Sequence, residues 1–122
     1  QAFARTATNP LPVTEQPVIA KHAVTGRRLL YVNTVFTTRL CGVAKDESDA
    51  VLSYLFHHCE HPNFQVRFRW EPHSIAFWDN RCTLHNAIAD YTGQRREMHR
   101  VTIIGERPFL ALGDDAHVVA AE

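Results

Sequence analysis

Short apolar and aromatic segments separated by turn residues dominate the second half of this sequence. Residues 64–70 alternate strictly, with Phe, Val, Phe and Trp at every second position and Gln or Arg between them. Residues 74–78 and 83–87 flank the turn dipeptide Asp79-Asn80, and residues 95–105 end in a β-branched run. Alternation with period two is typical of a strand, because successive side chains point to opposite faces. The sequence therefore predicts four short strands between residues 64 and 105.

Residues 46–59 carry the one clear helical pattern. Apolar residues recur there at helical spacing and form a broad stripe, while acidic residues in the first turn and histidines in the last turn suit the helix dipole. Pro62 is expected to end the helix. The apolar stripe consists of Val51, Leu52, Leu55, Phe56 and Cys59.

The remaining predicted elements are short. Residues 17–20 and 28–32 flank Thr25-Gly26 and predict a hairpin, and residues 36–41 predict a loop or a short extended piece. We expect an irregular lead-in over residues 1–16 and a largely loose tail over residues 110–122.

Length and composition bound the class of protein. A chain of 122 residues holds one modest core, and several short strands with one helix predict a mainly β fold, part of a jelly roll. The formal net charge of zero argues against broad binding to nucleic acid or to a membrane surface, and no apolar run reaches the ~20 residues that span a bilayer. Three cysteines without close pairing favour a reducing, cytoplasmic location.

Two arginines and a histidine stand out on the predicted strands. On a strand over residues 95–105, Arg96, Met98, Arg100 and Thr102 share one face. Guanidinium groups on a mainly inward face are costly to bury unless an anion meets them. Because His85 adds a nitrogen ligand on a nearby segment, these residues suggest a pocket for a metal and an oxyanion.

These residues carry a specific resemblance. Trp78-Asp79-Asn80-Arg81, then His85, then residues 94–100 (Gln-Arg-Arg-Glu-Met-His-Arg), then residues 102–105 resemble the C-terminal part of the TauD/TfdA family of iron(II)- and 2-oxoglutarate-dependent oxygenases. The resemblance extends over about residues 17–109, most of the chain. It includes Thr25-Gly26-Arg27, Tyr31-Val32-Asn33, Phe36-Thr37-Thr38-Arg39, Phe64-Gln65-Val66-Arg67 and Pro108-Phe109.

The resemblance implies a fold, cofactors and roles. Residues 1–122 would be the C-terminal part of one oxygenase domain, a double-stranded β-helix. It implies Fe(II), 2-oxoglutarate and O2, with His85 as a metal ligand and Arg96 binding the distal carboxylate of 2-oxoglutarate. Arg100 would bind a small anionic substrate, a sulfonate such as taurine, near Phe36. The products would be sulfite and an aldehyde. The oligomeric state, including a homo-oligomer, is left open.

Structural alternatives stay open for these residues. His85 could be a core or surface histidine whose nitrogens are satisfied by hydrogen bonds. Arg96 could form an ion pair with Asp79 or Glu97, and Arg100 a salt bridge. Phe36 could pack in the core. We expect Trp78, Asp79, Asn80 and Arg81 to be structural supports, with Asp79 and Asn80 shaping the turn.

The sequence lacks half of the expected metal site. The family carries a His-x-Asp/Glu pair upstream of the distal histidine, and only His58-Cys59-Glu60 fits that pattern, at the end of the predicted helix. We therefore expect a longer enzyme. The alternatives are a sulfate-ester or aryloxyalkanoate dioxygenase of the same family, or a non-catalytic β-barrel module that lacks the first two ligands.

Overall fold

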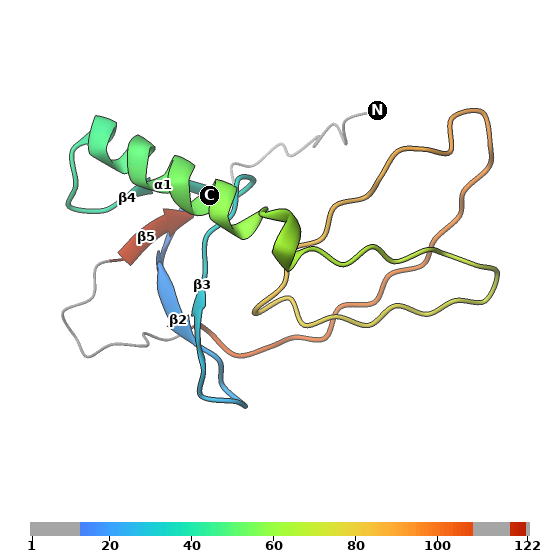
Figure 1. Ribbon diagram of the computed structural model, residues 1–122. Coiled ribbons are helices and arrows are strands. Elements are labelled where there is room, and N and C mark those ends of the chain that lie inside the picture. The colour runs from blue at the N-terminus through green and yellow to red at the C-terminus, as the bar shows by residue number, and fades with distance from the viewer. Residues whose placement is uncertain (1–12, 109–117, 122) are drawn as a thin grey trace.

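The structure is a computed structural model that describes residues 13–108 and 118–121. The elements, in chain order, are β1 (Thr14–Pro17), β2 (Ile19–Lys21), β3 (Arg28–Leu30), β4 (Thr37–Leu40), α1 (Lys45–Cys59), the 3-10 turn η1 (Pro62–Phe64) and β5 (Val118–Ala121). Figure 1 shows the helix and strands gathered at one end, with residues 65–108 running out from them as long loops.

The strands form two small antiparallel sheets. In the first sheet β5 lies between β1 and β4, with Val119 paired with Gln16 on one side and Leu40 on the other. The pairing of β4 is irregular between Thr37 and Arg39. The second sheet is the hairpin of β2 and β3, in which Ala20 pairs with Leu29.

The β2–β3 hairpin confirms the predicted hairpin with shifted bounds, because its strands are Ile19–Lys21 and Arg28–Leu30 and Pro17 belongs to β1. Its connecting turn closes through hydrogen bonds from the His22 amide to the Arg27 carbonyl, 2.9 Å, and from the Gly26 amide to the His22 carbonyl, 2.8 Å. Gly26 has φ +69°, a conformation that residues with a Cβ adopt only at a cost. The dipeptide Thr25-Gly26 therefore marks the turn for a stereochemical reason.

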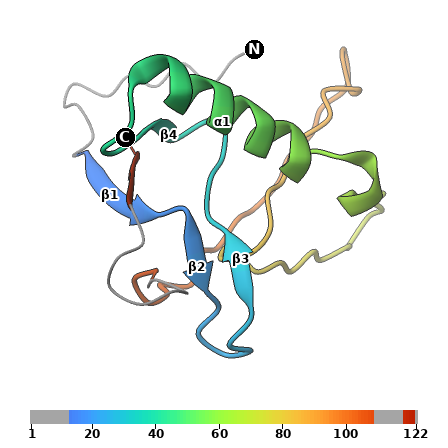
Figure 2. The ribbon, with the colours of Figure 1, turned by 60° about the vertical axis from the view of Figure 1, so that its left-hand side comes forward.

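Helix α1 confirms the predicted helix, beginning one residue earlier, at Lys45. Asp46 and Glu47 lie in its first turn, and His57 and His58 in its last. Figures 1 and 2 both show α1 lying alongside β4. No helix within the described residues is long and apolar enough to cross a membrane.

A small core holds the helix against the strands. Leu52 and Val32 are each 3% exposed, and they pack with the partly buried Val18, Leu40, Leu55, Phe56 and Cys59. Ser48 is also buried, and its hydroxyl accepts a hydrogen bond of 2.7 Å from the Leu40 amide. This bond joins α1 to β4.

Two segments of the predicted irregular ends form strands in the structure. Residues 14–16 of the predicted lead-in belong to β1, and residues 118–121 of the predicted loose tail form β5. Each segment gains its structure by pairing with the other, so its local sequence carries little signal. Residues 1–12, 110–117 and 122, the rest of those two predictions, lie outside the described residues.

The four strands predicted between residues 64 and 105 are not formed. Between described residues, the backbone–backbone hydrogen bonds donated from residues 65–108 are local turn bonds, such as Ser74 to Glu71 and Gln94 to Tyr91. Phe64 itself lies in η1. A strand requires a neighbour that pairs with its backbone, and alternation specifies only an extended chain. Apolar side chains of this segment are accordingly exposed, Val66 to 94% and Ile104 to 97%.

Replacing Ser48 with alanine should destabilise the fold. The Leu40 amide would lose its acceptor, which we expect to lower the free energy of unfolding by about 1–3 kcal/mol. Chemical denaturation measures the change, with Ser53→Ala on the exposed face of α1 as the matched control. Equal stability of the two variants would show that the Ser48 hydroxyl does not hold β4 to the helix.

Candidate functional site

A hydrogen-bonded turn at Asp79 lies at the centre of the candidate site. The Asp79 carbonyl accepts hydrogen bonds from the Cys82 amide, 3.2 Å, and from the Thr83 amide and hydroxyl, 3.1 and 2.6 Å. The Trp78 indole N–H donates to the Asn80 side chain, 2.9 Å. These contacts confirm that Asp79 and Asn80 shape the turn.

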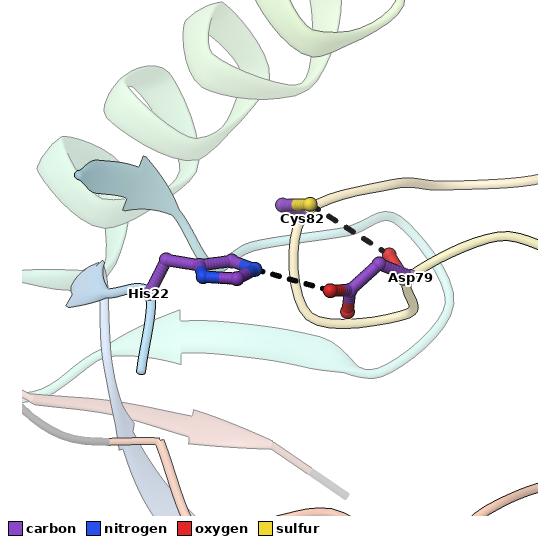
Figure 3. Close-up of side chains that lie close together, drawn as sticks. All are labelled: His22, Asp79 and Cys82. Carbon is purple, nitrogen blue, oxygen red and sulfur yellow. Dashed lines mark hydrogen bonds and ion pairs between the residues drawn. The ribbon is translucent and has the colours of Figure 1, made fainter. Parts of the chain in front are cut away.

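His22 brings this turn to the β2–β3 hairpin. Its Nε2 lies 3.0 Å from Asp79 Oδ2, and its Nδ1 lies 3.2 Å from the amides of both Val24 and Thr25. Figure 3 shows the imidazole pointing from the end of β2 toward the Asp79 carboxylate. The contact joins residues 57 positions apart in the sequence.

Arg81 supplies the charge that balances Asp79. Its Nε lies 2.9 and 3.1 Å from the two carboxylate oxygens, and its Nη2 lies 2.7 Å from Oδ2. These side-chain bonds, then the Arg81 amide and then His22, hold the pKa of the Asp79 carboxyl well below its usual range. The same side-chain bonds raise the pKa of Arg81. Asp79 is therefore a carboxylate at neutral pH.

His22, Asp79 and Cys82 form the one group among the described residues whose ligand atoms come close enough to hold a metal ion, all within 4.8 Å. Their chemistry does not fit a cation. The Arg81 guanidinium already covers both carboxylate oxygens, and His22 Nε2 faces Oδ2. A divalent ion would have to displace one positive group and one hydrogen-bond donor, so the group is better described as a structural network.

His85 lies on the segment that leaves this turn. Its ring is exposed and packs against the Trp78 ring, with centroids 5.1 Å apart and planes tilted by 45°. Within the described part of the chain, neither ring nitrogen of His85 takes part in a hydrogen bond or ion pair. The alternative of a histidine satisfied by hydrogen bonds is therefore not observed there.

Arg96 and Arg100 are both exposed. The Arg96 guanidinium lies over the Tyr91 ring, 4.9 Å from its centroid. Asp79 and Glu97 are the carboxylates considered as partners of Arg96. In the structure they pair with Arg81 and Arg95 instead. No strand over residues 95–105 places the two guanidiniums on one inward face, and no contact within the described residues joins either of them to His85.

Phe36 precedes β4 and is placed by the Asn33 side chain. The Asn33 Oδ1 accepts hydrogen bonds from the amides of Val35, 3.0 Å, and Phe36, 2.9 Å. Thr37 closes the turn with a bond of 3.1 Å from its amide to the Asn33 carbonyl. The Phe36 side chain is 43% exposed, which does not fit the alternative of core packing.

The contact between His22 and Asp79 was not predicted from the sequence. A histidine at the end of a short strand, just before Thr25-Gly26, is a weak signal on its own. Because the two residues are 57 positions apart, no local pattern relates them. The one available clue was that His22 is polar in a hairpin whose other inward residues, such as Ala20, are apolar.

Comparison with known proteins gives a consistent family. The family model described as "Taurine catabolism dioxygenase TauD, TfdA family" matches residues 1–102. Eighteen curated proteins match the chain, whereas no solved structure does.

Three relatives show the range of described activities. The chain is 36% identical to an alpha-ketoglutarate-dependent sulfonate dioxygenase of Saccharomyces cerevisiae, covering 80% of the chain and 24% of the relative. It is 38% identical to an alpha-ketoglutarate-dependent sulfate ester dioxygenase of Pseudomonas putida, covering 83% and 33%. It is 30% identical to an alpha-ketoglutarate-dependent 2,4-dichlorophenoxyacetate dioxygenase of a Burkholderia species, covering 86% and 35%. The chain thus spans about a quarter to a third of these relatives.

The stabilising effect of Asp79 should depend on pH. Because its pKa is lowered by folding, its contribution is present above the unfolded-state value of about 3.9 and is lost as the pH falls through the folded-state pKa. We expect Asp79→Asn to lower the melting temperature at pH 7, with the gap to the wild type narrowing towards about pH 3. Thermal denaturation across this range measures it.

The matched control is Asp49→Asn, which removes a carboxylate from an exposed pair with Lys45 on α1. We expect this variant to change the melting temperature little at pH 7, because exposed ion pairs contribute little. An Asp79→Asn gap that stays constant with pH would contradict the role assigned to the charge.

Proposed function

Because the chain belongs to the TauD, TfdA family of taurine catabolism dioxygenases, we propose that its protein is an Fe(II)- and 2-oxoglutarate-dependent dioxygenase acting on a small sulfonate. The observation that carries the proposal is the similarity, over 80% or more of the chain, to relatives described as alpha-ketoglutarate-dependent dioxygenases. His85, Arg96 and Arg100 are of residue types that can bind iron, a carboxylate and a sulfonate.

His85 is the proposed iron ligand of this chain. An imidazole suits Fe(II), and the His85 ring nitrogens make no described hydrogen bond. A site of two histidines and one carboxylate needs two further ligands, and no described cluster of three metal-ligating side chains includes His85. We propose that residues outside this chain supply them. When bound, iron with 2-oxoglutarate and O2 supplies the oxidising power of the reaction.

Arg96 is the proposed partner of the distal carboxylate of 2-oxoglutarate. A guanidinium matches a carboxylate through two parallel hydrogen bonds and keeps its charge at all physiological pH values. Packing over the Tyr91 ring limits the orientations of the Arg96 side chain without occupying its donors. Support also comes from the absence of a carboxylate partner for Arg96 among the described residues.

Arg100 is the proposed substrate residue, and Phe36 the proposed contact for the carbon chain. Together they would orient a sulfonate such as taurine so that the carbon bearing the sulfonate is oxidised. One sulfonate, 2-oxoglutarate and O2 would give an aldehyde, sulfite, succinate and CO2. Sulfate esters and aryloxyalkanoates are the alternative substrates, since relatives described as acting on a sulfate ester and on 2,4-dichlorophenoxyacetate match equally long parts of the chain.

The proposed fold of the full domain is a double-stranded β-helix, to which this chain contributes the C-terminal portion. Support comes from residues 65–108, which make no ladder hydrogen bonds with other described residues and expose apolar side chains such as Phe77, 88%, and Ile104, 97%. Strands from elsewhere in the domain would pair with this backbone and cover these side chains.

The proposed location is the cytoplasm. Cys41, Cys59 and Cys82 are all free thiols in the structure, which suits a reducing compartment. The proposed partner is a small anionic substrate, and the balanced charge of the chain offers no broad surface for nucleic acid.

His85→Ala should abolish both Fe(II) binding and succinate formation in the full protein, because the ring is a proposed ligand. Anaerobic Fe(II) titration and a succinate assay measure the two effects. The control is His99→Ala, which removes another exposed imidazole of the same segment. Turnover at the wild-type rate in the His85→Ala variant would contradict the assignment. A wild-type protein that binds neither Fe(II) nor 2-oxoglutarate would instead support the non-catalytic β-barrel module.

Replacing each of the two arginines should affect the KM of a different compound, 2-oxoglutarate for Arg96 and the sulfonate for Arg100. Losing a charge-assisted pair worth roughly 1.5–3 kcal/mol, Arg96→Ala should raise the KM for 2-oxoglutarate about 10- to 150-fold. Arg100→Ala should raise the KM for the sulfonate by a similar factor and leave the KM for 2-oxoglutarate nearly unchanged. Steady-state kinetics with taurine, an alkyl sulfate and an aryloxyacetate measures both and identifies the preferred substrate.

The control for both variants is Arg95→Ala, since Arg95 is exposed and paired with Glu97. We expect this variant to keep both KM values. If Arg96→Ala and Arg100→Ala raise the same KM, the division of roles between the two arginines is wrong.

A further inference from the structure

We infer that His22 is a positioning residue for His85: by donating a hydrogen bond to Asp79, it holds the turn that leads to His85 against the β2–β3 hairpin. The inference rests on the proposed role of His85 as an iron ligand. His22 itself does not contact His85, so it acts through the turn.

The hydrogen bonds fix the direction of the contact. His22 Nδ1 lies 3.2 Å from two backbone amides, those of Val24 and Thr25, and each amide can only donate. Nδ1 must therefore accept and carries no proton, which leaves the ring hydrogen on Nε2. That hydrogen points to Asp79 Oδ2 at 3.0 Å. The hairpin turn thus selects the tautomer that binds the carboxylate.

Burial makes this bond structurally important. The His22 side chain is 10% exposed, whereas that of Asp79 is 33% exposed. Among the described residues, only His22 and Ser48 are buried polar side chains, and both bond to another segment. A buried donor that loses its acceptor costs more than a typical hydrogen bond contributes, so this bond resists opening.

The path from Asp79 to His85 is short. The Asp79 carbonyl accepts hydrogen bonds from Cys82 and Thr83, and Thr83 lies two residues before His85. Trp78, directly before Asp79, packs its ring against the His85 ring. Fixing Asp79 therefore restrains His85 from both sides, along the backbone and through the indole.

The segment after the turn has no other polar anchor. Residues 84–90 make no hydrogen bond or ion pair with any described residue. Figure 1 shows that this part of the chain continues outward as a loop. The turn at Asp79, held by His22, is thus the last polar fixation point before His85.

Two substitutions of His22 separate its two functions. The Oδ1 of asparagine can occupy the position of Nδ1 and accept from Val24 and Thr25, but it cannot reach Asp79. The amide of glutamine can occupy the position of Nε2 and donate to Asp79, but it abandons the turn. His22→Asn therefore tests the contact with Asp79, and His22→Gln tests its rescue. Thr25→Ala, which removes the hydroxyl that accepts from the Arg27 amide, perturbs the hairpin turn alone.

The first measurement is amide hydrogen exchange in the metal-free full protein. We expect His22→Asn to speed exchange at the Cys82 and Thr83 amides roughly two- to tenfold. His22→Gln and Thr25→Ala should leave that rate within about twofold of the wild type. Unchanged exchange in His22→Asn, or faster exchange in His22→Gln than in His22→Asn, would overturn the inference.

The second measurement is Fe(II) affinity. We expect His22→Asn to weaken Fe(II) binding roughly tenfold and His22→Gln to restore most of it, because a misplaced imidazole ligand loses affinity. Equal Fe(II) affinity in wild type and His22→Asn would overturn the inference. If the wild type binds no Fe(II), the proposed function fails, and hydrogen exchange still decides whether His22 holds the turn.

A double variant guards against a general loss of folding. If His22 acts through Asp79, combining His22→Asn with Asp79→Ala should speed exchange at Cys82 and Thr83 no more than Asp79→Ala alone. Additive effects would show that His22 and Asp79 act independently, and would overturn the inference.

Discussion

The hydrogen bond between the His22 imidazole and the Asp79 carboxylate is the constraint on which the candidate site depends. It joins a hairpin, whose geometry is set locally by a glycine turn, to a segment that makes only turn bonds of its own. Arg81 balances the carboxylate charge, so the bond stays favourable although Asp79 is a third exposed. The site is thus positioned by one polar contact between distant residues, while the small apolar core around Leu52 holds only the helix and strands.

How much of the fold could be predicted follows from the range of the interactions. The helix from Lys45 to Cys59 and the turn at Gly26 depend on residues a few positions apart, and both were predicted correctly. Strand β5 depends on partners about 80 and 100 residues away, and its local sequence gave no signal. Residues 64–105 show the opposite failure. Their alternation is clear, but a pattern in one segment cannot supply the neighbouring backbone that makes it a strand.

The site divides in the same way. His85, Arg96 and Arg100 were singled out by residue type and by resemblance to a family, and the family is shown by the match over residues 1–102. Their roles remain predictions, since contacts within the described residues bring no two of them together. His22 was missed because its importance lies in its burial and its partner, which only coordinates reveal. For Arg96 the alternative of an ion pair with Asp79 or Glu97 is not observed among the described residues, because these carboxylates bind Arg81 and Arg95 instead.

The position of β5 between β1 and β4 also sets an order of events during synthesis. β1 and β4 do not pair with each other in the described sheet, so neither has a partner there until residues 118–121 have left the ribosome. The hairpin and α1 need no such delay, because their contacts are local. Before residues 118–121 are synthesised, a nascent chain would therefore contain a folded hairpin and helix together with β1 and β4, whose backbone edges are unpaired. Chaperones would bind the chain most readily at this stage.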